Sequence, residues 1–195
     1  MPLDRTYSVT IVRRFKAADL AMPARDDIER GEDVGLAGNQ HYQDLRGIGW
    51  EEVAAALKRE AMLIARFDAA VDLDGEANRY EEECAEAFLP EEDLWGLDVG
   101  VAGAVLALSA MDAIPVSSCN AGGFGGHHAA SFPHVAFYLK PAAAADVLAV
   151  AEIADVGLDI VVGGIGRLFG RTDFDLHRFA QVALARHRAS QSASE

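Results

Sequence analysis

The chain has 195 residues, of which 51% are hydrophobic, and a formal net charge of −14 at pH 7. This length fits one domain, or one domain with a small appendage, and the hydrophobic fraction predicts a packed core rather than disorder. The most apolar stretch, residues 99–110, is far shorter than the roughly 20 residues of a membrane span, so we expect no membrane insertion.

The cysteine count and the N-terminus predict where the protein resides. Cys84 and Cys119 are the two cysteines, which is too few for a disulfide framework. The N-terminus lacks the charged and apolar regions of a signal peptide. Together these features predict a cytoplasmic protein with reduced thiols. The sequence identifies no cofactor.

Charge is distributed unevenly along the chain. No Lys or Arg occurs between Arg79 and Lys140, while acidic residues gather there: Glu81, Glu82, Glu83, Glu86, Glu91, Glu92, Asp93, Asp98 and Asp112. Nucleic-acid backbones are bound by clustered Lys and Arg, so this composition argues against nucleic acid as a partner. The acidic run is either a solvated surface or a face for a basic protein partner.

The first half of the chain contains two clear periodic segments. Residues 7–15 alternate as a strand does, and residues 50–67 place their apolar side chains on one helical stripe. Residues 16–49 predict a long loop with one short helix. Residues 72–96 form an acidic connector, which divides the chain into an N-terminal portion, residues 1–97, and a C-terminal core, residues 98–195.

The second half predicts an ordered series of elements. Asp98 suits the cap of a helix that runs to residue 112, and Gly157 suits the end of a later helix. Thr172 and Asp175 resemble a capping box, and Gly163-Gly164 suits a hairpin turn. The predicted order is helix 98–112, strand 114–117, strand 133–139, helix 141–155, strand 158–162, strand 165–169 and helix 173–188. This order predicts an α+β fold, in which an antiparallel or mixed sheet carries helices on one face.

The candidate site is the glycine-rich loop of residues 117–134. Cys119 follows two hydroxyl residues and precedes the glycines, so it is either a nucleophile, a small buried hydrophobe or a metal ligand. His127 and His128 are the histidines expected to lower its pKa. We expect the neighbouring polar side chains of the loop and of the last strand to contact a ligand: Ser117, Ser118, Asn120, His134 and Arg167.

Other chemistry in this loop is less well supported by the spacing. With Cys119, the three loop histidines supply enough ligands for zinc, but the Cys-x-x-Cys and His-x₃₋₅-His spacings are missing, so we assign no metal. The glycines lead towards a strand and not into a helix, which argues against a phosphate loop. Arg167 either holds an anion or pairs with an acidic residue.

One segment resembles a pattern found in small uncharacterised bacterial proteins. The pattern is Gly-Ile-Pro-Thr, two residues, Ser-Cys-x-Gly, and then a Pro-x-Val-x-Phe strand. The matching residues here are 113–122, Ala-Ile-Pro-Val-Ser-Ser-Cys-Asn-Ala-Gly, and 133–137, Pro-His-Val-Ala-Phe. The resemblance implies a paired-strand α+β core and a bacterial origin, and it implies no catalytic residue.

Two functions follow from these observations. The charge asymmetry predicts a binding or interaction module with an acidic face. The alternative is a small hydrolase or transferase that uses Cys119 and a histidine of loop 117–134.

Overall fold

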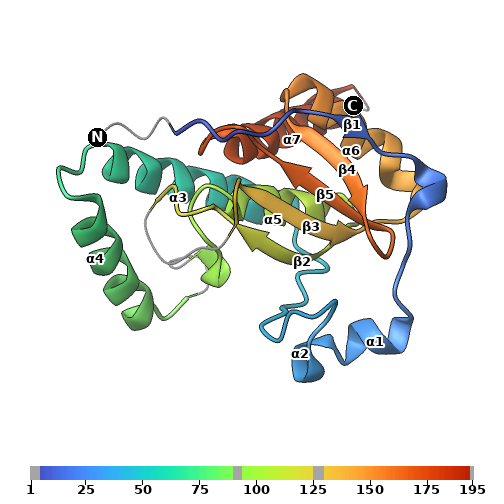
Figure 1. Ribbon diagram of the computed structural model, residues 1–195, viewed down its shortest axis with the longest axis horizontal. Helices are drawn as coiled ribbons and strands as arrows, with labels where there is room; N and C mark the ends of the chain where they lie inside the picture. Colours follow the sequence, from blue (N-terminus) through green and yellow to red (C-terminus); the bar gives the residue numbers. More distant parts are fainter. Residues whose placement is uncertain (1–4, 90–93, 125–129, 194–195) are drawn as a thin grey trace.

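The computed structural model describes residues 5–89, 94–124 and 130–193. The α+β fold that the sequence predicts is confirmed, and its sheet has five strands of mixed direction (Figure 1). The elements, in chain order, are β1 (Arg13–Arg14), η1 (Ala17–Asp19), α1 (Arg25–Glu29), α2 (Gly31–Val34), α3 (Trp50–Asp68), α4 (Leu73–Glu86), η2 (Leu94–Gly96), α5 (Ala102–Ala110), β2 (Ile114–Cys119), β3 (His134–Tyr138), η3 (Pro141–Ala143), α6 (Ala144–Ile153), β4 (Gly157–Val161), β5 (Ile165–Phe169) and α7 (Asp175–Ser192).

The strands lie in the order β1-β4-β5-β3-β2, so β2 is an edge strand. β1 is parallel to β4, and the other neighbours are antiparallel. Gly163 and Gly164 form the predicted turn between β4 and β5, with φ of 87° and 73°, values that strongly favour glycine. The strand predicted over residues 7–15 is shorter than expected, since only Arg13 and Arg14 pair with β4.

One face of the sheet is covered by the long helices and is called here the helical face (Figure 1). At its centre lies α5, whose residues 102–109 are all buried. Side chains of α3, such as Val53 and Leu57, share this core with α5, α7 and the sheet. Residues from both sides of position 97 therefore form a single core.

The opposite face of the sheet, called here the outer face, is also partly covered. Ile28, Leu36 and Tyr42 pack against Ile114 and Val116 of β2. The long helices lie on one face of the sheet as predicted, and the segment that contains the short helices α1 and α2 covers part of the outer face. The physical reason is that β2 carries apolar side chains on that face, which need cover.

Two predicted helix ends differ from the observed ones. The helix expected to begin at Asp98 begins at Ala102. The Asp98 carboxyl group instead accepts a hydrogen bond from the backbone N–H of Asn120. After α6, the left-handed residue is Asp155, with φ of 51°, and not Gly157. Gly157 starts β4, where the ring of Phe169 leaves no room for a Cβ.

Helix α4 projects away from the sheet and packs against α3 (Figure 1). Arg66 of α3 binds Glu76 and Glu83 of α4. Within the described ranges, no helix has the length and apolar character needed to cross a membrane.

Candidate functional site

The uncovered part of the outer face carries polar side chains at one end of β2 and β3. The cover formed by residues 28–42 contacts Ile114 and Val116, nearer the start of β2. Beyond it, the register puts Ser117, Cys119, His134 and Arg167 on the outer face, because their cross-strand partners alternate with the buried Val135. Four residues proposed from the sequence thus gather on one surface.

Cys119 and His134 are direct cross-strand partners in the antiparallel pair of β2 and β3. Directly opposite residues of such a pair place their side chains on the same face, with Cβ atoms about 4.5–5.5 Å apart. Both side chains are partly exposed. A thiol and an imidazole are therefore neighbours on a solvent-accessible sheet surface.

The turn after Cys119 is held by several hydrogen bonds. The Ala121 amide donates to Cys119 Sγ at 3.3 Å, and the Gly122 amide donates to Asn120 Oδ1 at 2.9 Å. Gly123 lies against Asp173, whose carboxylate leaves no room for a Cβ. An N–H group directed at the sulfur stabilises the thiolate form, since that form is the stronger acceptor.

His134 is oriented by its own strand. Nδ1 lies 3.3 Å from the Phe132 carbonyl oxygen. Because that oxygen only accepts, Nδ1 carries the hydrogen and Nε2 of the neutral ring is left as an acceptor. Burial lowers the pKa of His134, and the positive charge of Arg167 lowers it further, although the Phe132 contact raises it. The balance keeps the imidazole neutral at pH 7.

Arg167 interacts with an acidic and two aromatic side chains of the protein. Its guanidinium group binds the Asp159 carboxylate through two hydrogen bonds, of 3.0 and 2.7 Å. It also lies 5.6 Å and 5.4 Å from the ring centroids of Phe132 and Phe169. The sequence left two roles open for Arg167, anion binding and pairing with an acidic residue. The structure shows the second, an ion pair with Asp159. Arg167 sets the electrostatic environment of His134.

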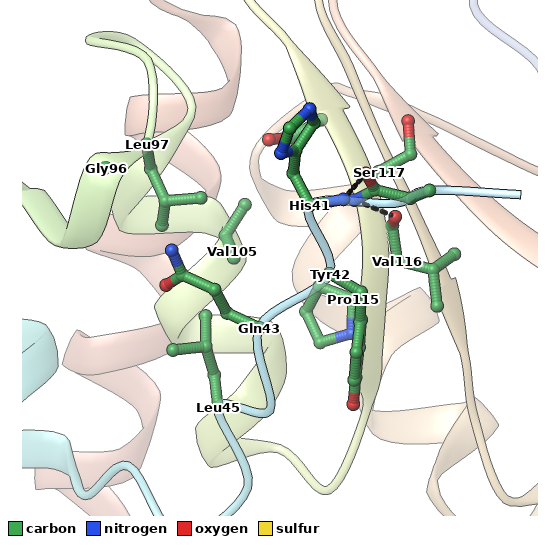
Figure 2. A pocket seen from close by; sticks show the side chains of 12 residues that line it. His41, Tyr42, Gln43, Leu45, Gly96, Leu97, Val105, Pro115, Val116 and Ser117 are labelled. Atoms are coloured by element: carbon green, nitrogen blue, oxygen red, sulfur yellow. Dashed lines mark hydrogen bonds between the residues drawn. The ribbon is translucent and has the colours of Figure 1, made fainter. Parts of the chain in front are cut away.

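Beside the outer edge of β2 lies a groove, which Figure 2 shows from close by. One wall is the segment 37–45, and the opposite wall is Gly96 and Leu97. The floor is the β2 segment from Pro115 to Ser118. The open part of the groove, lined by Ala37 and Gly38 together with Ser117 and Ser118, is called here its mouth. The mouth has a volume of about 500 Å³. The full lining is Ala37, Gly38, Asn39, His41, Tyr42, Gln43, Leu45, Gly96, Leu97, Val105, Pro115, Val116, Ser117 and Ser118.

Two backbone features shape this groove. A β-bulge between Pro115 and Ser117 interrupts the pairing of β2, and the Asn39 side-chain amide donates to the Val116 carbonyl at 2.9 Å. On the opposite wall, Leu94, Trp95 and Gly96 are consecutive residues with φ of 55°, 58° and 67°. Leu94 and Trp95 are strained at such angles, whereas glycine adopts them freely, and strain of this kind clusters at functional sites.

The structure places the site residues proposed from the sequence in different positions. Ser117 and Ser118 line the groove, and Cys119 and His134 lie beside it on the same strand pair. Asn120 is buried. Its side-chain amide stabilises the turn, because Nδ2 donates to the Val99 carbonyl and Oδ1 accepts from the Gly122 backbone N–H. The other proposed histidines, His127 and His128, lie outside the described residues.

Sequence reasoning did not find the groove residues of the 37–45 segment. Asn39, His41 and Gln43 lie in a stretch without hydrophobic periodicity, about 75 positions before β2, and no motif links them to it. Among the residues that the structure describes, no three His, Cys, Asp or Glu side chains gather as a metal site. Comparisons with protein families, curated proteins and solved structures found no match to this chain.

Proposed function

We propose that the protein is a small thiol-dependent hydrolase or transferase in which Cys119 is the nucleophile and His134 the general base. The observation that carries this proposal is the direct cross-strand pairing of the two residues. Two further features support it: the Ala121 amide donates to Sγ, and the lowered pKa of His134 favours a neutral base.

The reaction has two steps. Nε2 of His134 takes the thiol proton as Sγ attacks the carbonyl carbon of an acyl substrate, and the bond to the leaving group breaks as that group takes the proton. Water or a second acceptor then attacks the thioester carbon, gives its proton to His134, and releases the sulfur, which recovers a proton. If water is the acceptor, the protein is a hydrolase. If another molecule accepts the acyl group, the protein is a transferase.

Alkylation kinetics test this proposal without a known substrate. The parent is a Cys84→Ala variant, so that Cys119 is the single thiol. We expect iodoacetamide to alkylate Cys119 at neutral pH, and His134→Gln to slow that reaction. A 4-nitrophenyl acetate probe should leave one acetyl group on Cys119, detected by intact mass, and none on a Cys119→Ser variant. A thiol that is unreactive up to about pH 9, or whose alkylation rate is unaffected by His134→Gln, contradicts the proposal.

A second candidate is an interaction module that binds a basic protein through α4. It is supported by the position of this helix, which projects from the body (Figure 1) and exposes Glu81, Glu82 and Glu86. Arg66 and Arg79 neutralise other carboxylates of α4, so these three add to the net negative surface. Binding to poly-lysine should weaken with salt and on the triple change to Gln, because exposed charges are screened over about 10 Å at 0.1 M. Salt-independent binding contradicts this candidate.

We also propose a cytoplasmic location for the protein and a bacterial origin. The chain has two cysteines, Cys84 and Cys119, too few for a disulfide framework, which is typical of proteins in a reducing compartment. The bacterial origin is supported by the resemblance of residues 113–137 to the bacterial pattern.

A further inference from the structure

The floor of the groove is the outer edge of β2, one of the two edge strands of the sheet. β2 is the last strand in the order, and within the described part of the chain no strand pairs with its outer side. At Val116 this side already accepts a hydrogen bond, from the Asn39 side chain. An open strand edge presents N–H and C=O groups that pair with another extended chain. Beyond Val116 the edge continues along Ser117 and Ser118, which line the groove.

The groove is uncharged, although charged residues make up 25% of the chain. None of its lining residues is Asp, Glu, Lys or Arg. A charged group placed there would lose hydration without a compensating partner. The side chains of His41, Gln43, Ser117 and Ser118 make no hydrogen bond to the described residues, and they present both donors and acceptors to a ligand. The lining therefore favours an uncharged ligand rich in hydrogen-bonding groups.

We infer that the groove binds an uncharged, extended peptide segment, which pairs with the outer edge of β2 by strand addition. A peptide backbone supplies alternating N–H and C=O groups at the spacing that a strand edge requires, about 4.8 Å away. The volume of about 500 Å³ at the mouth lies within the roughly 300–1,000 Å³ of ligand pockets. The inference rests on the proposed function, because it makes a peptide the acyl substrate of Cys119, the residue that follows Ser118.

Binding is measured separately from chemistry by using the Cys119→Ser variant. The probes are N-acetylated, C-amidated tetrapeptides of Ala, Ser, Thr, Gln and Val, titrated into ¹⁵N-labelled protein. We expect amide signals of residues 38–43 and 116–118 to shift. N-methylation of a single peptide amide removes one donor and should weaken binding by about fivefold to tenfold. A probe with Asp or Glu at a central position should also bind more weakly than the uncharged parent.

A matched pair of protein variants locates the site. Gln43→Glu adds a charge to an exposed position of the groove, so we expect weaker binding of the uncharged probes. Lys58→Gln changes an exposed charge on α3, outside the groove, and should leave binding unchanged. Equal effects of the two variants, or binding that tolerates N-methylation at every amide, would overturn strand addition in the groove.

The two hypotheses fail in different ways. Peptide binding to the Cys119→Ser variant, together with a Cys119 that never acquires an acetyl group, leaves the groove assignment standing and removes the proposed chemistry. Acetylation of Cys119 without binding of any probe at millimolar concentration removes the peptide assignment and leaves the chemistry.

Discussion

Glu60 of α3 and His177 of α7 meet inside the helical layer, with Oε2 of Glu60 2.6 Å from Nδ1 of His177. The other carboxyl oxygen of Glu60 accepts hydrogen bonds from the amides of Gly100, at 2.9 Å, and Gly103, at 3.4 Å. These amides lie at the start of α5, whose N-cap residue, Val101, has no side-chain acceptor. A side chain of one helix therefore satisfies the first amides of another and joins three helices.

Removal of this carboxyl group should destabilise the protein strongly. Glu60 is fully buried, so Glu60→Ala leaves two amides and an imidazole without an acceptor. We expect a loss of about 3–5 kcal/mol in the free energy of unfolding, measured by urea denaturation. Glu60→Gln keeps one acceptor oxygen and should lose less. Glu51→Gln, at an exposed position of the same helix, is the control; a Glu60→Ala variant that matches it contradicts this role.

The central helix gives a second stability prediction. Leu106 of α5 is fully buried, so Leu106→Ala removes methyl groups from a packed core and leaves a cavity. We expect a loss of about 2–5 kcal/mol. Val162→Ala truncates a side chain that is 96% exposed, and should change stability by less than about 0.5 kcal/mol. Denaturant melts of the two variants that coincide would show α5 to be peripheral.

Local sequence signals predicted most of the C-terminal fold, and they failed where distant residues intervene. The Gly163-Gly164 turn and the helix from Trp50 follow from neighbouring residues alone. The start of α5 does not, because its amides are satisfied by Glu60, about 40 positions earlier. A charged residue on an otherwise apolar helix carries no sign of the partner that it will meet.

The candidate site was predictable in part for the same reason. Cys119 and His134 flank one loop between two predicted strands, and antiparallel pairing brings such residues together. The groove is different, since His41 and Gln43 reach β2 from an irregular segment. Their position depends on the packing of Tyr42 and Leu36 against the sheet, which no local pattern encodes.

The lowered pKa of His134 gives a prediction about pH. Its ordinary value is 6.5, and the folded value lies below it because burial disfavours the charged ring. The unfolded chain therefore binds more protons at this residue between the two values, so its contribution to stability is complete above 6.5 and is lost as the pH falls towards the folded pKa. NMR titration of the His134 ring should show a midpoint below 6.5. A midpoint at or above 6.5 contradicts the neutral base; His41, which is exposed, is the internal comparison.

The attachment of α4 should weaken in acid. Hydrogen bonds from the Arg66 guanidinium group lower the pKa of Glu83, and those from Arg79 and Arg66 lower the pKa of Glu76. Both carboxyl groups ordinarily titrate near 4.5, and depressed folded values mean that their contribution to stability is present above that pH. The contribution is lost as the pH falls through the folded values, because protonation removes the ion pairs that hold α4 to α3.

Hydrogen exchange should show α4 amides losing protection before those of α5 as the pH is lowered, after correction for the intrinsic exchange rate. In an Arg66→Gln variant this difference should already be present at neutral pH, whereas Arg25→Gln, which removes a pair on the distant helix α1, should leave α4 protected. Equal protection of α4 in wild type and Arg66→Gln at neutral pH would show that apolar contacts, such as that between Phe67 and Tyr80, are sufficient to hold the helix.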